Sequence, residues 1–320
     1  MAQTVEELGE HALIERIRAR LPPLPGFVVL GIGDDAAVIE PERNALEVIT
    51  TDSQVEGVHF DQRFVGPADI GYKALAVNLS DLAAMGALPR VALLSLILPS
   101  AWPVASVDAL LDGMMVLAER TRISLVGGNI ARSPGPLIVD VTATGSVHPR
   151  QMLTRAGARA GDELYVTGVL GGSSAGLQAL QSAGEAADNL LMRYRRPEPR
   201  TRFGLLLGRN RAARACIDLS DGLADAVRQL ASASGVGAIV EADTVPIEQG
   251  ATLRDALSGG EDYELLFAVP PRMRSRLTNV RRLVKDVGVT KIGCLTSDRA
   301  LLLNRHGGTE SLPAGFAHFA

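Results

Sequence analysis

Two successive series of strand-like and helix-like segments make up this sequence, and their order restricts the fold more than any other feature. A change of pattern at Gly157–Asp162 separates the two series. Alternation of both segment types within each half predicts a mixed α/β (α+β) protein. A length of 320 residues favours two domains, which we expect at residues 1–149 and 150–320.

Hydrophobic spacing predicts the individual elements within these halves. Glycine-rich runs at 127–135 and 168–172 are expected to be loops. Helical spacing is expected at residues 69–85, 107–118, 173–182, 201–209 and 221–234. Strands are expected at residues 27–30, 47–50, 91–98, 123–126, 137–144, 163–167, 238–241, 263–269 and 291–295.

The composition indicates an ordinary globular protein with no basic surface. The formal net charge is −4 and no dense Lys/Arg run occurs, so we expect no nucleic-acid partner. Two cysteines, Cys216 and Cys294, are too few for a disulfide framework or a zinc site. No signal-peptide pattern is present, and no apolar run approaches the ~20 residues of a membrane span. We therefore expect a soluble, cytoplasmic protein without a membrane partner.

Carboxylates placed among Gly, Ser and Thr recur along the whole chain. Such oxygen donors suit hard divalent cations, which sit beside phosphates. This series predicts a magnesium-dependent phosphoryl-transfer enzyme. A Walker-type P-loop and protein-kinase signatures are absent, so transfer would depend mainly on metals and positioning. The acidic motifs are Gly31–Asp35, Thr50–Asp52, Asn78–Asp81 and Asp218–Gly222.

The first motif also matches a different kind of site. Gly31–Ala36 has the G-x-G-x-x-A spacing of a dinucleotide-binding loop. In such sites an acid that binds the ribose follows the loop by about 20 residues, and Asp52 lies near that position. Only residues 36–46 separate this loop from the next strand, and Pro41 interrupts them, so a crossover helix does not fit. A cation held by Asp34 or Asp35 fits better, although a glycine turn with amide-bonded Asp side chains is an alternative.

Each of the other acids has a local alternative. Asp52 lies where we expect a strand to end, after Thr50 and Thr51. A hydroxyl and a carboxylate there could face one ion, or Asp52 could be a solvated strand end or a helix cap. Asp81 lies beside the apolar stripe of its helix and could face a cleft or water. In Asp218–Asp221, one side chain could be the N-cap of the next helix, or the motif could bind phosphate oxygens at the helix start.

Several uncharged or isolated residues are weaker candidates. Gly127–Asn129 is expected to be a turn at a strand end, suited to close approach by a phosphate. Arg155 could clamp phosphate or be a solvated surface charge, and His59 could be a packing residue. Glu261 lies in a loop entering an apolar strand, and an aromatic residue at the end of the chain could stack on a flat ligand.

Taken together, these motifs resemble the thiamine-monophosphate kinase family, of the superfamily that includes aminoimidazole ribonucleotide synthetase and selenophosphate synthetase. The likeness covers nearly the whole chain. It is carried by Gly9–Ile14, Gly33–Asp35, Thr51–Phe60, Lys73–Gly86, Asp218–Leu223, Gly260–Leu266 and Gly315–Phe319.

The resemblance implies transfer of the ATP γ-phosphoryl group to the phosphate of thiamine monophosphate, which gives thiamine diphosphate and ADP. It also implies an N-terminal domain that binds ATP and magnesium and pairs its sheet with a second subunit, followed by a C-terminal α/β domain. A homodimer is expected. The attacking phosphate is already anionic, so we assign no catalytic base.

The same resemblance implies roles for individual residues. Magnesium ions would be held by Asp34, Thr50, Thr51, Asp52, Asp81, Asp218 and Asp221. ATP would be contacted by Gly128, Asn129, Arg155 and Ser220. Thiamine monophosphate would be contacted by His59, Glu261 and Phe316.

One position departs from the family pattern. The family usually has Gly-Gly-Asp where this chain has Gly127–Asn129, so Asn129 keeps an oxygen ligand and loses a charge. An ATP-dependent ribonucleotide cyclo-ligase and a noncatalytic nucleotide or thiamine-phosphate binder remain alternatives. Selenophosphate synthesis is disfavoured because the N-terminal glycine-rich region has no Cys, and a nicotinamide oxidoreductase is the weakest alternative.

Overall fold

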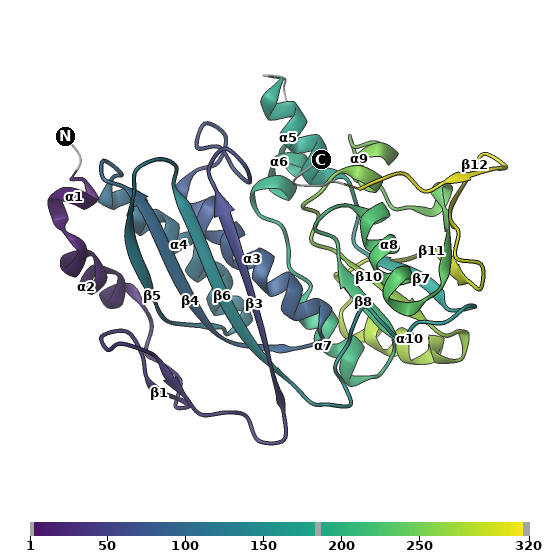
Figure 1. The fold of residues 1–320 in the computed structure, drawn as a ribbon, viewed down its shortest axis with the longest axis horizontal. Coiled ribbons are helices and arrows are strands. Elements are labelled where there is room, and N and C mark those ends of the chain that lie inside the picture. Colours follow the sequence, from purple (N-terminus) through teal and green to yellow (C-terminus); the bar gives the residue numbers. More distant parts are fainter. Residues whose placement is uncertain (1–2, 183–186, 316–320) are drawn as a thin grey trace. The chain divides into compact units, whose positions relative to one another are not determined.

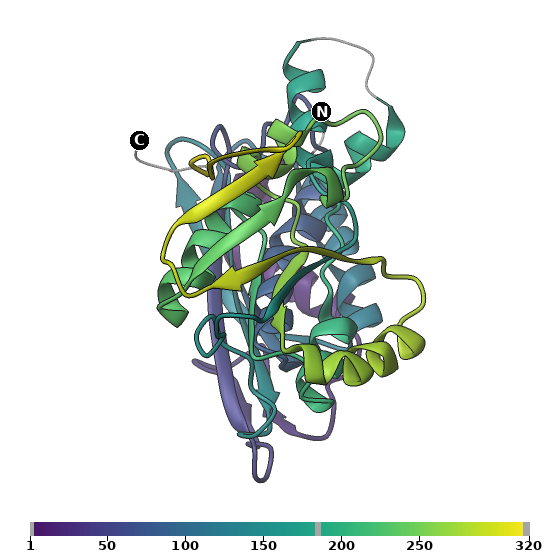
Figure 2. The same cartoon turned by 90° about the vertical axis from the view of Figure 1, so that its right-hand side faces the viewer.

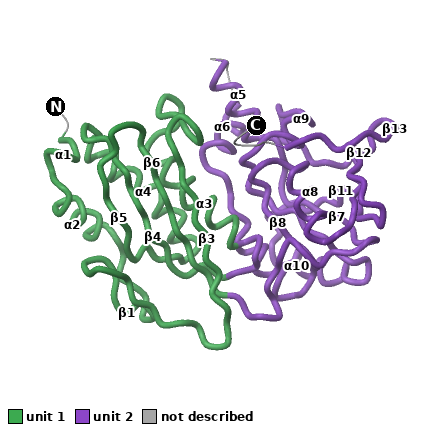
Figure 3. The backbone as a smooth tube through the Cα atoms, in the orientation of Figure 1, with its two compact units in different colours: residues 1–82, 88–146 green, residues 83–87, 147–320 purple. Residues whose placement is uncertain are grey.

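The computed structural model describes residues 3–182 and 187–315. The chain divides into two compact units: residues 1–82 with 88–146, and residues 83–87 with 147–320 (Figure 3). Each unit combines helices with its own main β-sheet. Within the described ranges, no helix has the length and apolar character needed to cross a membrane.

A four-stranded sheet forms the centre of the first unit, with strand order β3-β6-β4-β5. Strand β4 pairs antiparallel with β6 and parallel with β5. The long helices α3 and α4 lie against one face of this sheet (Figure 1). The elements are α1 (Val5–Leu8), α2 (Glu10–Arg20), β1 (Val28–Leu30), β2 (Val38–Ile39), β3 (Leu46–Val55), α3 (Pro67–Ala84), β4 (Leu88–Pro99), α4 (Val104–Thr121), β5 (Ser124–Ser133) and β6 (Ile138–Val147).

Helix α3 is buried on more sides than its sequence pattern predicts. The predicted apolar stripe of Leu75, Leu79 and Leu82 is confirmed, and each of these side chains is at most 1% exposed. Lys73 and Val77, on the neighbouring stripe, are buried as well. The reason is that α3 packs against α4 in addition to the sheet, so little of its surface is left for solvent.

Two strands of this unit extend beyond their predicted ends. Strand β3 continues to Val55, so Asp52 lies within the strand and not at its end. Strand β5 runs through Gly127–Asn129, so the predicted loop at 127–135 is wrong over most of its length. These glycines remain in the strand because β4 pairs with them along their backbone, after a bulge between Ala92 and Leu93.

The second unit is built on a seven-stranded sheet with order β13-β12-β9-β11-β7-β10-β8. All its described pairings are antiparallel except β12 with β9. The elements are β7 (Glu163–Thr167), α5 (Gly172–Gln181), α6 (Asp188–Arg195), α7 (Thr201–Arg209), β8 (Ala215–Asp218), α8 (Leu223–Ser234), β9 (Gly237–Glu241), η1 (Ala242–Thr244), α9 (Leu253–Ser258), β10 (Leu265–Val269), η2 (Pro271–Met273), α10 (Arg274–Leu283), β11 (Val289–Thr296), β12 (Leu301–Arg305) and β13 (Gly308–Ser311).

Side chains of this sheet are buried on both faces. Along β10, Leu266 packs in one apolar cluster with Val227 of α8, and Phe267 packs in a second with Phe203 of α7. Every residue of β10 is buried, and the helices around the sheet are seen from the side in Figure 2. This two-sided cover explains why the strand sequences are continuously apolar. The predicted helix at 201–209 is confirmed with the same bounds.

Candidate functional site

The Gly31–Asp35 motif forms the turn after β1. Strand β1 pairs antiparallel with β2, and no helix lies between β1 and β3. The dinucleotide-binding interpretation is therefore excluded, because that site needs a crossover helix. Asp34 is exposed, and its Oδ1 accepts a hydrogen bond from the Asp35 amide (2.9 Å). The turn uses one carboxylate oxygen and leaves the other available to a ligand.

Alternation along β3 divides the Thr50–Asp52 motif between two faces of the sheet. Thr50 and Asp52 are half-buried and share a face with Gln54, which is buried. Thr51 lies on the opposite, exposed face, where its hydroxyl donates to the Val141 carbonyl oxygen (3.2 Å). The expectation that neighbouring hydroxyl and carboxylate face one ion thus fits Thr50 with Asp52, and it does not fit Thr51.

Asp81 lies on α3 at the covered face of the sheet. The Thr50 hydroxyl donates a hydrogen bond to Asp81 Oδ2. Asp81 is half-buried and therefore not fully surrounded by solvent. Strand β3 and helix α3 therefore bring together oxygen donors from two of the predicted motifs.

Gly128 and Asn129 lie on the exposed part of β5, and the predicted turn at this position is wrong. Asn129 is paired with Ser95 across the sheet, and Ser95 is paired with Asp140 on its other side. The Asn129 amide lies 3.5 Å from Ser95 Oγ, and Asp140 accepts a hydrogen bond from Ser53 Oγ (2.5 Å). This polar row crosses the open face of the four-stranded sheet.

His59 follows the turn at the end of β3. Its Nδ1 accepts the Val55 amide (3.1 Å), so a neutral His59 carries its proton on Nε2. The His59 carbonyl oxygen accepts from the buried Lys73 ammonium (3.4 Å). These bonds fix the ring against its own turn while leaving the side chain partly exposed.

In the second unit, the Asp218–Gly222 motif links β8 to α8. Asp218 is buried, whereas Ser220 and Asp221 are partly exposed. The N-cap of α8 is Gly222, and no side chain caps the helix. The capping interpretation of this motif is therefore wrong. The motif lies at a helix start, where the positive end of the helix dipole favours anions.

Arg155 and the described end of the chain both lie along α8. Arg155 Nη1 donates to Gln229 Oε1 (2.6 Å), and Gln229 in turn donates to Asp225 (2.5 Å). Gly315, the last described residue, packs against Asp225 and the Asp221 carbonyl oxygen. The predicted residue Phe316 lies outside the described residues. The described part of the chain therefore stops beside the Asp218–Gly222 motif.

Glu261 reaches the same motif from a different direction. Its amide donates to the Ser220 carbonyl oxygen (2.6 Å). Within the second unit, the structure thus brings Asp218, Ser220, Asp221 and Glu261 together around the start of α8. Arg155 lies further along the helix, where its guanidinium reaches Gln229 and its carbonyl oxygen accepts from Ser234 (3.2 Å).

Two buried carboxylates that follow Glu261 were not among the predicted site residues. Asp262 is 7% exposed and Glu264 is 1% exposed. Glu264 is bound by both Arg200 and the Thr167 hydroxyl. The sequence signal that could have found them is a pair of acids directly before an apolar strand. Acids in that position are buried with the strand, and a buried carboxylate requires hydrogen-bond donors from elsewhere in the fold.

Asp262 also occupies a site that resembles a phosphate-binding loop. Its carboxylate accepts the amides of Gly171 and Ser173 at the start of α5. The predicted loop at 168–172 leads into this helix, and two amides of the helix start are bound by Asp262. In this structure a carboxylate therefore occupies a position that would suit a phosphate.

No described group of three or more His, Cys, Asp or Glu side chains is arranged to hold a metal ion. Magnesium commonly takes one or two carboxylates and completes its shell with phosphate oxygens and water. The oxygen-only donors of β3 and α3 fit that kind of site. They do not form a closed protein cage.

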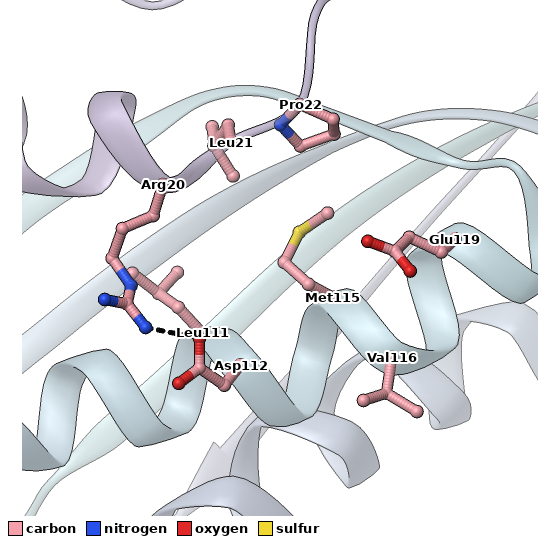
Figure 4. A pocket seen from close by; sticks show the side chains of 8 residues that line it. All are labelled: Arg20, Leu21, Pro22, Leu111, Asp112, Met115, Val116 and Glu119. Carbon is pink, nitrogen blue, oxygen red and sulfur yellow. Dashed lines mark hydrogen bonds and ion pairs between the residues drawn. The ribbon is translucent and has the colours of Figure 1, made fainter.

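A cavity elsewhere in the first unit contains none of the predicted residues. It lies between the end of α2 and helix α4, next to the ion pair of Arg20 with Asp112 (Figure 4). Its other lining residues include Met115, Val116 and Glu119. This cavity gives no support to a role in phosphoryl transfer.

Comparison with known families gives two matches along the chain. The N-terminal domain of AIR synthase related proteins matches residues 33–147, and the C-terminal domain of the same proteins matches residues 159–301. The predicted mixed α/β fold class is confirmed by these matches. HypE of Escherichia coli, which is 21% identical with a TM-score of 0.79 over 95% of this chain and 96% of its own, shares the fold.

Three proteins of higher sequence identity point to one function. Thiamine-monophosphate kinase of Escherichia coli (strain K12) is 41% identical in an alignment of 331 positions, gaps included, that covers 98% of each chain. The solved thiamine-monophosphate kinase of Stenotrophomonas maltophilia K279a is 37% identical, with a TM-score of 0.82 over 95% of this chain and 98% of its own. AaThiL, solved in complex with AMPPCP and TMP, is 32% identical with a TM-score of 0.77 over the full length of both chains. The chain therefore belongs to the thiamine-monophosphate kinase family.

Proposed function

We propose that this protein phosphorylates thiamine monophosphate to thiamine diphosphate with ATP as the phosphoryl donor, in thiamine diphosphate biosynthesis. The observation that carries the proposal is the 41% identity to the Escherichia coli kinase over 98% of both chains. The AaThiL complex with AMPPCP and TMP supports the same pair of substrates, because that chain aligns with this one over its full length.

The reaction is a direct in-line displacement. A phosphate oxygen of thiamine monophosphate forms a bond to the γ-phosphorus as the bond between that phosphorus and the β,γ-bridging oxygen breaks, and ADP leaves. The nucleophile is already anionic, so the protein needs no general base. What the protein must overcome is repulsion between two polyanions, which it does by holding both in position among charge-neutralising groups.

Magnesium fits the oxygen donors of this chain. The residues named below would hold magnesium, which would supply positive charge to offset the charge that develops on the phosphates. Thr50 and Thr51 lie on opposite faces of β3, which favours several ions over one. The proposed ligands are Asp34, Thr50, Thr51, Asp52, Asp81, Asp218 and Asp221.

The residues proposed to contact each substrate come from both halves of the sequence. We assign ATP and magnesium binding to residues 1–149, together with dimerisation, and a C-terminal α/β domain to residues 150–320. The proposed ATP contacts are Gly128, Asn129, Arg155 and Ser220. The proposed thiamine monophosphate contacts are His59, Glu261 and Phe316.

The protein is proposed to act as a cytoplasmic homodimer. One face of the four-stranded sheet is covered by α3 and α4, and the other exposes Ile49 (68%) and Leu93 (40%). A second copy of the sheet would remove these side chains from water. Light scattering coupled to size-exclusion chromatography would test this state, and a monomer at micromolar concentration would contradict it.

The activity is tested by chromatographic detection of thiamine diphosphate. Purified protein is incubated with ATP, magnesium and thiamine monophosphate, and free thiamine serves as a parallel substrate. Product from the monophosphate alone is expected, because the acceptor of the transfer is a phosphate. Absence of product while ATP still binds would overturn the kinase assignment and favour a binding protein or another acceptor.

A further inference from the structure

The segment between α9 and β10 has an unusual backbone. Glu261 and Tyr263 both have left-handed conformations, with φ of 68° and 51°. Neither residue is glycine, so each carries a conformational cost. Strain of this kind persists only where surrounding structure enforces it, and it concentrates at functional sites.

Backbone hydrogen bonds tie this segment to the Asp218–Gly222 motif. The Glu261 amide donates to the Ser220 carbonyl oxygen (2.6 Å), and the Tyr263 amide donates to the Leu219 carbonyl oxygen (2.9 Å). In return, the Leu219 amide donates to the Glu264 carbonyl oxygen (2.8 Å). The backbone at Glu261, and with it the direction of the Cα–Cβ bond, is therefore fixed relative to Ser220.

Asp262 lies between the two left-handed residues and anchors them to α5. Its Oδ2 accepts the Gly171 amide at 2.7 Å, and its Oδ1 accepts the Ser173 amide at 3.4 Å. Gly171 has φ of 84°, and an added Cβ would crowd Asp255 and Ala256 of α9, so this contact depends on glycine. The carboxylate thus holds the strained segment against a rigid helix start.

This anchor does not add to stability in the usual way. Burial raises the pKa of Asp262 to about 7; the amides of Gly171 and Ser173 oppose the shift, nearby Glu264 adds to it and Arg193 opposes it. Because the pKa is higher in the folded than in the unfolded chain, ionising Asp262 costs more free energy in the folded state. At pH 8 the charge of Asp262 therefore lowers the free energy of unfolding.

Asp255 provides a direct contrast. It is also 7% exposed and also accepts a helix-start amide, from Thr252 (2.9 Å). Burial opposes its ionisation, but hydrogen bonds from Thr252, Gln178 and Ser174 outweigh this and hold its pKa below the usual value. Ionisation of Asp255 therefore favours the folded state, whereas ionisation of Asp262 opposes it.

We infer that Asp262 is a positioning residue of the proposed reaction, which holds Glu261 in the direction that contacts thiamine monophosphate. The inference rests on the proposed function. Its basis is the combination of a buried two-amide contact to α5 with left-handed backbone on both sides of Asp262. A residue whose charge opposes folding fits a role in function better than a role in stability.

The test is Asp262→Asn, which has nearly the same shape but only one acceptor oxygen and no charge. Loss of the buried charge offsets loss of one amide contact, so the variant should melt within about 2 °C of the wild type at pH 8, or above it. We expect the KM for thiamine monophosphate to rise about tenfold, with the KM for ATP changing less than about threefold. Isothermal calorimetry with thiamine monophosphate should show the same loss of affinity.

The matched control is Asp255→Asn, which should lower the melting temperature and leave both KM values unchanged. Equal effects of the two variants on KM would overturn the inference. So would an Asp262→Asn variant that fails to fold while Asp255→Asn folds, since Asp262 would then serve stability. If the wild-type protein forms no thiamine diphosphate, the proposed function fails instead, and unchanged calorimetric affinity in Asp262→Asn would separately reject the positioning role.

Discussion

The two sheets of this protein place their chemistry in different ways. The four-stranded sheet is covered on one face, and candidate residues such as Thr50, Thr51 and Asn129 lie on its strands. The seven-stranded sheet is buried on both faces, so its candidates lie in the loops that leave the strands, at Asp218–Gly222 and Glu261. A sheet that is covered on one face can carry binding side chains on its strands. A sheet that is buried on both faces must carry them in loops, whose backbone is fixed by hydrogen bonds.

The largest expected effect is on the covered side of the first sheet. Asp81→Asn keeps an oxygen that can accept the Thr50 hydroxyl, so the fold should survive. Loss of the charge should lower kcat at limiting magnesium by about 100-fold or more, because charge neutralisation is the main requirement of this transfer. Steady-state kinetics across a magnesium titration measure this.

The control is Asp108→Asn on α4, where the carboxylate pairs with Arg16 and takes no part in the proposed site. Asp108→Asn should leave kcat within about twofold of the wild type, since exposed ion pairs contribute little. If Asp81→Asn behaves like this control, Asp81 holds no ion, and the proposed division of chemistry between the two sheets loses its first half.

The second effect sharpens the comparison by asking how tightly the exposed strand is packed. A Cβ added to Gly128 would overlap the Leu94 carbonyl oxygen, whereas one added to Gly135 would meet nothing. Gly128→Ala should therefore destabilise the protein by roughly 1–3 kcal/mol, and Gly135→Ala should be neutral or slightly stabilising. Urea unfolding of both variants measures this difference. Equal stabilities of the two variants would contradict the close pairing of Gly128 with Leu94.

The third effect concerns a carboxylate of the two-sided sheet that serves stability. Arg274 holds the pKa of Glu163 at about 2, against the opposition of burial and with help from Lys291 and Tyr165. Because the folded-state pKa is depressed, this contribution is present above the usual Glu range and is lost as the pH falls from about 4.5 toward 2.

After allowance for screening of the exposed partners, the loss should be on the order of 1–2 kcal/mol. The measurement is the free energy of unfolding of wild type and Glu163→Gln at pH 6 and pH 3. The difference between them should shrink at the lower pH. A constant difference would show that Glu163 contributes through shape and not through charge.

Sequence patterns predicted the fold class and most elements, because hydrophobic spacing directly reflects which faces are buried. They missed the continuation of β5 through Gly127–Asn129, since glycine favours turns locally and only pairing with β4 keeps it extended. They also missed Asp262, whose partners Gly171 and Ser173 lie about 90 positions away in the chain. Local rules follow the hydrophobic spacing of single elements, whereas long-range backbone contacts are decided by the assembled fold.

The smallest expected effect is at Asn129, where this chain departs from the Gly-Gly-Asp pattern of its family. Asn129→Asp would place a carboxylate across Ser95 from Asp140, on the open face of the first sheet. With magnesium present, the added charge should attract the ion and lower the magnesium concentration for half-maximal activity by about threefold. Without magnesium, repulsion from Asp140 should lower the melting temperature slightly, whereas Asn129→Ala should change neither quantity in that direction. An unchanged magnesium requirement in Asn129→Asp would mean that no ion approaches the open face, so the ligands of the first unit would all lie on the side covered by α3.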